Sequence, residues 1–417
     1  MGGLWRGNKE VLKPTSTNGC GTNPNLRERI ASTMAFPSSK PPTCRELLRC
    51  LGDVCRPSLE QGVALCDADR YVKQYGSVGF ALSLIAFYIL GLGSLRELQA
   101  RLKGDSRLTS LVGWAGISVS QLLKLPHQRL TQLWAPLVAL LMQRVSGTHR
   151  TGKLRIVDTS FFSMGLKLMQ RYHPNKKMTH SATAGFKLGA VLDPDNAMPV
   201  HVISTVGQGT DTAHLNALVP PDQPIAGHTF LFDRGFRKYE FFDRLIENKA
   251  HFISRATTQT RYEIIKNRAL HPAHPEILSD QTVRLGTAKS RTRMTHLTRR
   301  IELKTQHETL VFLTSNLKRG AWNICEDYRI RWDIEPFFRW FKSGIGCRRS
   351  VGYSLNAAQH TFWAALVVYL LILLLAERVK SPTTGRMTFR IKPTIHRVRA
   401  VLHEPVSRGD LEALGFL

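Results

Sequence analysis

The hydrophobic pattern of the sequence changes near residue 154. Before this point apolar residues recur every three or four positions, which is typical of helices. After it, short segments rich in β-branched and aromatic residues alternate with turn sequences such as DPDN and PPDQP. The segments that we interpret as strands are LRIVDTSFFSM, GFKLGAVLD, MPVHVISTV, HTFLFDRGF, HFISRA and TLVFLTSNL, with one helix-like stretch, TAHLNALV, among them. The pattern predicts an α/β fold with a mixed sheet.

The same pattern divides the chain into parts. Residues 1–42 are rich in Gly, Pro, Ser, Thr and Asn and predict a flexible N-terminal arm. Residues 43–150 predict a helical domain, for which gripping DNA and packing onto the next domain are equally good explanations. Residues 151–256 and 309–380 would form the α/β core with its flanking helices, and residues 381–417 a basic C-terminal tail.

Residues 257–308 differ from the core on either side of them. They are polar, with the alternation of β-strands, and between Arg284 and Lys304 seven Lys or Arg residues stand against one Glu. We interpret them as a basic β-rich insertion that presents positive charge to phosphates. A solvated hairpin is the simpler alternative.

The overall charge favours a polyanionic partner. Lys and Arg number 58 against 31 Asp and Glu, which gives a formal net charge of +27 and suits nucleic acid or an anionic membrane surface. The seven cysteines include no CxxC pair and follow no signal peptide, so we expect a reduced, cytoplasmic protein. The cluster Cys44, Cys50, Cys55 and Cys66 lacks the paired spacing of zinc sites.

Two apolar runs raise the question of a membrane protein. Val78–Leu95 is interrupted by glycines and serines, and Phe362–Ala376 has about 15 residues, fewer than the roughly 20 of a spanning helix. We therefore expect buried helices of a large core and no membrane partner.

The stretch YRIRWDIEPFFRWFK, residues 328–342, has two different faces if it is helical. Tyr328, Arg331, Glu335 and Lys342 fall within roughly 60° of one another at about 100° per residue. On the opposite face are the apolar side chains of Ile330, Ile334, Phe337 and Phe341. A plain amphipathic surface helix also explains this pattern. Pro336 predicts a kink or a helix start beside Glu335.

Two further carboxylates change the interpretation of Glu335. Asp158 follows the apolar run LRIV, and Asp233 follows TFLF, so each is expected at the end of a buried strand. Three converging acids would repel one another unless a cation lay between them, and hard oxygen ligands suit Mg²⁺ or Mn²⁺. Two such ions can promote phosphodiester displacement. The sequence thus predicts a catalytic and metal-binding site of Asp158, Asp233 and Glu335.

With these residues in view, the chain resembles a DDE insertion-sequence transposase of the bacterial group named for insertion sequence four. The signature of that group is Tyr, two residues, Arg, three residues, Glu, six residues and Lys, and Tyr328, Arg331, Glu335 and Lys342 match its spacing. Asp158 in IVDTSFF and Asp233 in FLFDRGF resemble the two family aspartates. The resemblance covers about residues 43–376.

The resemblance implies a fold and a set of roles. The fold would be an RNase H-like mixed sheet with flanking helices, an N-terminal helical domain, and a β-rich insertion between the second Asp and the Glu. Asp158, Asp233 and Glu335 would bind two Mg²⁺ ions, with Mn²⁺ as a substitute. Tyr328, Arg331 and Lys342 would hold DNA phosphates, a duty for which Arg234 and Arg339 are weaker candidates. Relatives also stack a flipped base on a Trp of the insertion, but residues 257–308 contain no Trp.

The function implied is metal-dependent cleavage and strand transfer at terminal inverted repeats of double-stranded DNA. A homodimer on DNA, in a bacterial cytoplasm and associated with the nucleoid, is the matching expectation. Three alternatives stay open: an RNase H-like nuclease that cuts without joining, an inactive DNA-binding remnant, and a membrane protein.

Overall fold

A computed structural model describes residues 51–114, 116–148, 152–163, 185–206, 210–287, 292–346, 351–352, 354–376, 378–380 and 387–403. The expected N-terminal arm and much of the expected C-terminal tail lie outside the described residues. The chain divides into two compact units. Of the described residues, the first unit contains 152–161 and 186–338, and the second contains those before residue 149, those around 162 and 185, and those from Arg339 onward.

The first unit contains a mixed sheet of nine described strands in the order β3-β2-β1-β4-β5-β9-β8-β7-β6. The strands are β1 (Leu154–Ser163), β2 (Gly185–Asp193), β3 (Met198–Val206), β4 (Thr229–Phe232), β5 (His251–Arg255), β6 (Tyr262–Asn267), β7 (Ile277–Leu285), β8 (Thr298–Lys304) and β9 (Thr309–Thr314). All six segments predicted as strands of the core are confirmed, and the α/β class with them.

The strand directions place the carboxyl ends of β1 and β4 together. β4 pairs in parallel with β1 on one side and with β5 on the other, whereas β2 and β3 pair antiparallel, as do β5 and β9. Parallel neighbouring strands run in the same direction. The residues that directly follow the paired segments of β1 and β4 therefore lie side by side.

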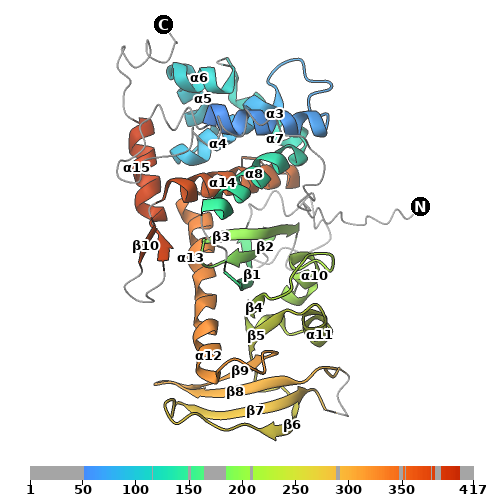
Figure 1. Cartoon of the computed structure of the whole chain (residues 1–417). Helices are drawn as coiled ribbons and strands as arrows, with labels where there is room; N and C mark the ends of the chain where they lie inside the picture. The colour runs from blue at the N-terminus through green and yellow to red at the C-terminus, as the bar shows by residue number, and fades with distance from the viewer. Residues whose placement is uncertain are drawn as a thin grey trace, which may run out of the picture. The chain divides into compact units, whose positions relative to one another are not determined.

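The strands β6, β7 and β8 come from the predicted insertion. β6 pairs antiparallel with β7, and β7 pairs antiparallel with β8. β8 in turn pairs antiparallel with β9 of the core, from Arg299 to Lys304. These strands therefore extend the sheet of the core instead of forming a second sheet, as Figure 1 also shows at the lower end of the first unit. The boundaries 257–308 stay a prediction.

Aromatic side chains fill the core beside the sheet. The helices of this unit are α10 (Leu215–Leu218), α11 (Tyr239–Glu247), α12 (Ala321–Arg329) and α13 (Ile334–Arg339). In Figure 1, α10 and α11 lie on one side of β4 and β5, and α12 lies on the other. Phe242 of α11 stacks on Phe252 of β5, with ring centroids 4.0 Å apart. Val157 and Phe232, which precede the two predicted catalytic aspartates, are fully buried, so the backbone before each aspartate is fixed by packing.

The second unit is largely helical; the boundaries 43–150 stay a prediction. Its elements are a π-helical turn (Leu51–Cys55), α3 (Arg56–Leu65), α4 (Ser77–Leu90), α5 (Leu95–Gly104), α6 (Ser106–Val112), α7 (Val119–Gln128), a 3₁₀ turn (Thr131–Trp134), α8 (Ala135–Thr148), a π-helical turn (Trp340–Gly344), α14 (Leu355–Leu375), β10 (Arg378–Lys380), β11 (Met387–Phe389) and α15 (Ile391–His403). α14 belongs to this unit, although the sequence pattern assigned it to the α/β core.

The helix α14 is the apolar centre of the second unit. It packs against α4, α7, α8 and α15, and being apolar around its whole circumference is typical of a buried helix. Its 21 residues include the apolar run from Phe362 and the turns before it, Leu355–Thr361. By length and composition it could span a membrane, and Ser77–Leu90 with Leu95–Gly104 passes the same test as a pair bent by 104°. However, 83% of the apolar window of α14 is buried among other helices, as in the core of a globular domain.

The imidazole ring of His360 is buried in this apolar helix. His360 accepts a hydrogen bond from Trp134 Nε1 at Nδ1 (2.9 Å), and its Nε2 lies 3.0 Å from the Arg129 carbonyl, to which it donates. Burial lowers the pKa of His360 to about 4. The ring is therefore a neutral, satisfied link between α14 and the segment before α8.

Candidate active site

Asp158 lies in β1, and Asp233 directly follows the adjacent parallel strand β4. The last paired residues of β1 and β4 are Val157 and Phe232, and each of the two aspartates is the next residue in the sequence. Asp158 was predicted to follow the end of its strand, and this was wrong in detail, because β1 continues to Ser163. Its pairing with β4 nevertheless ends at Val157, so both carboxylates lie at the same edge of that strand pair.

The Asp158 carboxylate is in an environment that disfavours its charge. Burial is the main cause that raises the pKa of Asp158 from 3.8 to about 6, and the negative charges of Asp233 and Asp211 raise it further. The backbone N–H of Thr159, which donates to Asp158 Oδ1 at 2.7 Å, and the charge of Arg331 act in the opposite direction. A further positive charge at this place would stabilise the ionised form.

The predicted single helix from Tyr328 to Lys342 is interrupted. α12 ends at Arg329, a 3₁₀ turn covers Ile330–Asp333, and α13 begins at Ile334. Pro336 stands in the first turn of α13, where a missing backbone N–H costs nothing. The predicted helix start beside Glu335 is confirmed.

Both faces of this stretch are buried in part. Ile334, Phe337 and Phe341 of the predicted apolar face are buried, but so are Tyr328 (4% exposed) and Arg331 (6%) of the polar face. A plain surface helix does not explain this burial. Of the polar face, Tyr328 and Arg331 therefore belong to the interior of the protein, whereas Glu335 and Lys342 are only partly buried.

Arg331 and Tyr328 form a polar contact with two unsatisfied atoms. The guanidinium of Arg331 lies 5.8 Å from the centroid of the Tyr328 ring and 4.7 Å from that of Trp332. Neither Arg331 Nε nor the Tyr328 hydroxyl has a hydrogen-bond partner of normal geometry among the described residues. Burial raises the pKa of Tyr328 to about 12, with Arg331 and Asp233 among the nearby charges. The charge of Arg331 lowers the pKa of Asp158, and the charge of Asp233 raises the pKa of Tyr328. The end of α12 and the 3₁₀ turn after it therefore lie near the two aspartates.

Glu335 and Lys342 are not among the main charges that affect the pKa of Asp158. Glu335 lies partly exposed in the first turn of α13, four residues after Arg331. Lys342 belongs to the second unit, where its Nζ lies 5.0 Å from the centroid of the Phe162 ring. Arg234 and Arg339 are exposed. In the part of the chain that the structure describes, no three His, Cys, Asp or Glu side chains lie in an arrangement that could hold a metal ion.

The donor atoms at the end of the β1–β4 pair nevertheless fit a hard divalent cation. Asp158 and Asp233 supply carboxylate oxygens from adjacent positions. Burial, and to a smaller extent the charges of Asp233 and Asp211, raise the pKa of Asp158, so a cation at this place would stabilise its ionised form. Among the described residues Cys55, Cys66 and Cys325 form no disulfide, and Cys55 and Cys325 are buried. Cys44 and Cys50 lie outside the described residues.

Sequence reasoning missed a fourth carboxylate, Asp211. Its Oδ1 accepts from Lys187 Nζ of β2 at 2.7 Å and from the hydroxyl of Thr159, the residue after Asp158. Burial would raise the pKa of Asp211, but these two hydrogen bonds and the Lys187 charge outweigh it, and the pKa is lowered. An ionised Asp211 therefore fixes Thr159 beside Asp158. The turn-like context GTDTAH gives no signal of this, because the contact joins segments 52 residues apart.

Trp332 was also overlooked. It is 56% exposed, which is unusual for a ring of this size, and it stands directly after Arg331. An exposed aromatic ring beside a buried cationic group offers a surface for stacking.

Comparison with known proteins identifies similar chains. The model of the family described as transposase DDE domain matches residues 149–371, more than half of the chain. The chain is 28% identical over 236 residues to the putative transposase y4zB of Sinorhizobium fredii, covering 55% of this chain and 63% of the relative. It is 25% identical over 269 residues to the probable transposase for insertion sequence element IS5377 of Geobacillus stearothermophilus, covering 64% of this chain and 68% of the relative. The chain thus spans less than two thirds of the length of the first of these relatives.

We predict that Asp158→Asn stabilises the metal-free protein at pH 7.5. The folded-state pKa of Asp158, about 6, lies above the ordinary value of 3.8, so the folded state loses stability as the pH rises through this interval. The variant should gain up to about 3 kcal/mol at pH 7.5, and the gain should shrink as the pH is lowered toward 4. Urea unfolding in a chelating buffer measures it, with the exposed Glu247→Gln as control. A variant less stable than the wild type at pH 7.5 would contradict the burial argument.

We also predict that Lys187 and Asp211 are energetically coupled. In a double-mutant cycle with Lys187→Met and Asp211→Asn, each single variant should lose stability and the double variant should recover part of it. The coupling should be on the order of 1–2 kcal/mol, because the pair is only partly screened from water. The exposed pair Lys238 and Glu240, 3.8 Å apart, is the matched control and should couple by less than about 0.5 kcal/mol. Strict additivity at Lys187 and Asp211 would refute the link.

Proposed function

Because the chain belongs to the family of proteins with a transposase DDE domain, we propose that it is the DNA transposase of an insertion sequence. It would bind the terminal inverted repeats of its element, hydrolyse phosphodiesters there, and join the freed 3′ ends to target DNA. The observation that supports this most is the alignment of Asp158 and Asp233 at the end of β1–β4 pairing, with Arg331 and Tyr328 brought to them.

The sheet supports an RNase H-like core for this activity. Its half β3-β2-β1-β4-β5 combines an antiparallel β2–β3 pair with parallel β1–β4 and β4–β5 pairs. In this arrangement the catalytic acids would come from the adjacent central strands β1 and β4 and from a later helix, here α13. The match of Tyr328, Arg331, Glu335 and Lys342 to the signature of the insertion sequence four group supports membership of that group.

Asp158, Asp233 and Glu335 would hold the divalent metal, two Mg²⁺ ions or Mn²⁺ in their place. When bound, the metal would activate a hydroxyl nucleophile and stabilise the leaving oxygen of the phosphodiester. These three carboxylates would fix the position of the metal. Asp211, whose pKa is lowered, would accept the hydrogen bond of the Thr159 hydroxyl and so hold the β1 backbone next to Asp158.

The unsatisfied atoms of Arg331 and Tyr328 would receive a DNA phosphate. The guanidinium Nε and the phenolic hydroxyl are both donors, and a phosphate oxygen would satisfy them at the cost of no other bond. Lys342 would neutralise a further phosphate, and Arg234 and Arg339 are exposed cations that could assist. The exposed ring of Trp332 would stack on a base.

A transposase acts on two DNA ends in concert, so a homodimer on DNA is part of the proposal. The bacterial cytoplasm, in association with the nucleoid, is the location that the DNA substrate requires. A nuclease that cuts without joining is the second candidate, because the three acids alone would suffice for hydrolysis. An inactive DNA-binding remnant is disfavoured by the presence of all three acids.

We predict metal-dependent nicking of an oligonucleotide that contains the element's end, taken from the inverted repeats flanking the reading frame. Asp158→Asn, Asp233→Asn and Glu335→Gln should each reduce the rate on the order of a thousand-fold or more, since the acids act as a unit. Glu247→Gln, an exposed carboxylate of α11, should nick at the wild-type rate. Gel electrophoresis of end-labelled DNA measures this.

Joining products with a target plasmid distinguish the two enzyme proposals. Nicking and joining support the transposase, and nicking without joining under any metal supports the nuclease. Wild-type nicking that survives Asp158→Asn or Glu335→Gln would refute the three-acid site. Absence of any metal-dependent cleavage would favour the remnant.

A further inference from the structure

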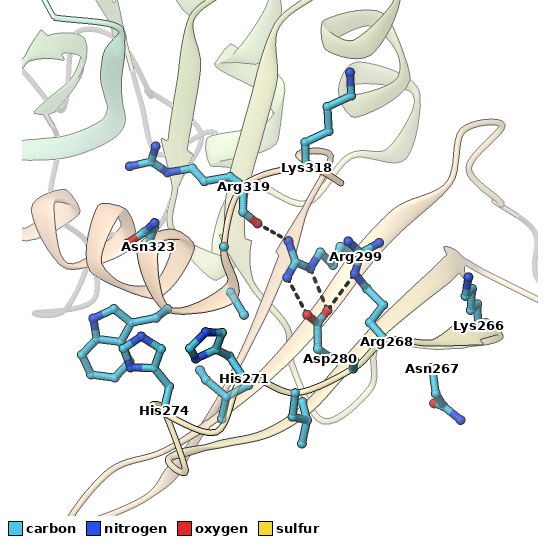
Figure 2. A pocket seen from close by; sticks show the side chains of 16 residues that line it. Lys266, Asn267, Arg268, His271, His274, Asp280, Arg299, Lys318, Arg319 and Asn323 are labelled. Carbon is cyan, nitrogen blue, oxygen red and sulfur yellow. Dashed lines mark hydrogen bonds and ion pairs between the residues drawn. The ribbon is translucent and has the colours of Figure 1, made fainter.

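A hollow of about 730 Å³ lies at the far part of the first unit, away from the strand edge of Asp158 and Asp233. It is formed by the end of β6 and its connection to β7, by the first half of β7 and the start of β8, and by the segment that joins β9 to α12 together with the first turn of α12 (Figure 2). Its lining includes five Lys or Arg side chains, namely Lys266, Arg268, Arg299, Lys318 and Arg319, and a single carboxylate, Asp280. The charge of the lining is therefore strongly positive, which suits a phosphate-containing ligand.

The base of the hollow is rigid. Asp280 and Arg299 are both 4% exposed, and Arg299 Nε donates to Asp280 Oδ1 at 2.7 Å. Arg268 lies 3.6 Å from the same carboxylate oxygen and donates to the Leu317 carbonyl at 2.8 Å, as the dashed contacts of Figure 2 show in part. One carboxylate thus holds two guanidinium groups in place, and the pair of arginines retains a net positive charge.

Two lysines of the rim add charge that is not compensated. Lys266 and Lys318 are exposed, and neither makes an ion pair within the described part of the chain. Arg319, by contrast, is bound to Asp327 at 2.7 Å. Lys266 and Lys318 are therefore the groups of the rim that are available for a phosphate.

The opposite wall is aromatic. The rings of His274 and Trp322 are parallel within 1°, with centroids 4.8 Å apart, and His271 lies 5.8 Å from His274. Figure 2 shows His271 and His274 together on the side of the hollow away from Lys266 and Lys318. Trp322 is only half-buried, so a planar group can reach this wall.

From this combination we propose that the hollow binds an unpaired nucleotide of a DNA strand. The base would stack against the His274–Trp322 wall, and the adjoining phosphates would be neutralised by Lys266 and Lys318. Alternating basic and aromatic groups are the usual recognition surface for single strands. A concave site of several hundred Å³ admits a nucleotide, whereas a duplex would rest on its rim and would not reach Trp322.

The inference rests on DNA being the substrate, as in the proposed function, but not on the three acids. It assigns an unpaired segment of the substrate to the β6–β9 part of the sheet. Binding can therefore be measured without metal and without cleavage.

The test is fluorescence anisotropy of labelled oligonucleotides with the whole chain in a chelating buffer. The probes are a single-stranded DNA of about 20 nucleotides, the blunt duplex of the same sequence, and the RNA strand of that sequence. The variants are Trp322→Ala, the conservative Trp322→Phe, and Lys266→Ala combined with Lys318→Ala. The matched control is Lys304→Ala, which removes an exposed lysine at the end of β8, outside the lining.

We expect Trp322→Ala and the double lysine variant to weaken single-strand binding roughly tenfold. Their duplex affinity should change about twofold or less, Trp322→Phe should restore most of the loss, and Lys304→Ala should have little effect. Equal losses for single strand and duplex, no loss for Trp322→Ala, or tighter binding of RNA than of DNA would each overturn the proposal. Metal-dependent nicking of the duplex end, measured separately, distinguishes this failure from failure of the proposed function.

Discussion

The parallel pairing of β1 with β4 is the interaction on which the candidate site depends. It aligns Val157 with Phe232, both fully buried, so that Asp158 and Asp233 come next to each other by register alone. A slip of one residue would turn one carboxylate to the other face of the sheet. The aromatic core around Phe232, Phe242 and Phe252 therefore does more than stabilise the unit, because it also fixes the distance between two charges.

Holding these charges together is unfavourable in the metal-free protein. Burial and the neighbouring acids raise the pKa of Asp158 to about 6, and Arg331 compensates only in part. Lys187 and Thr159 keep Asp211 ionised close by, which adds to the negative potential. Such uncompensated charge is what a cation-binding site requires before the cation arrives. Arg331 Nε and the Tyr328 hydroxyl are donors without a hydrogen-bond partner among the described residues, and in the proposed function a DNA phosphate would accept from them.

Much of this was predictable from sequence where local pattern decides. The six core strands follow from short segments rich in β-branched and aromatic residues between turn sequences, and the helix start beside Glu335 follows from Pro336. The inclusion of α14 in the helical unit and the joining of β8 to β9 depend on long-range packing, which no local pattern encodes. Asp211 and the hollow at Trp322 were missed for the same reason. Lys187 and Asp211 become neighbours only once the sheet has formed, and the wall of His274 and Trp322 joins segments 48 residues apart.

The central claim is that Asp158, Asp233 and Glu335 bind metal at one place. Iron-directed cleavage of the polypeptide measures this most directly. Fe²⁺ replaces Mg²⁺ in the site, and ascorbate with peroxide generates hydroxyl radicals at the bound ion. Mass spectrometry then locates the breaks in the backbone. If the three acids bind one metal site, breaks should occur near residues 158, 233 and 335, should be suppressed by excess Mg²⁺ and should be lost together in Asp233→Asn. Breaks near 158 and 233 without 335, or breaks only at histidines and cysteines elsewhere, would contradict it.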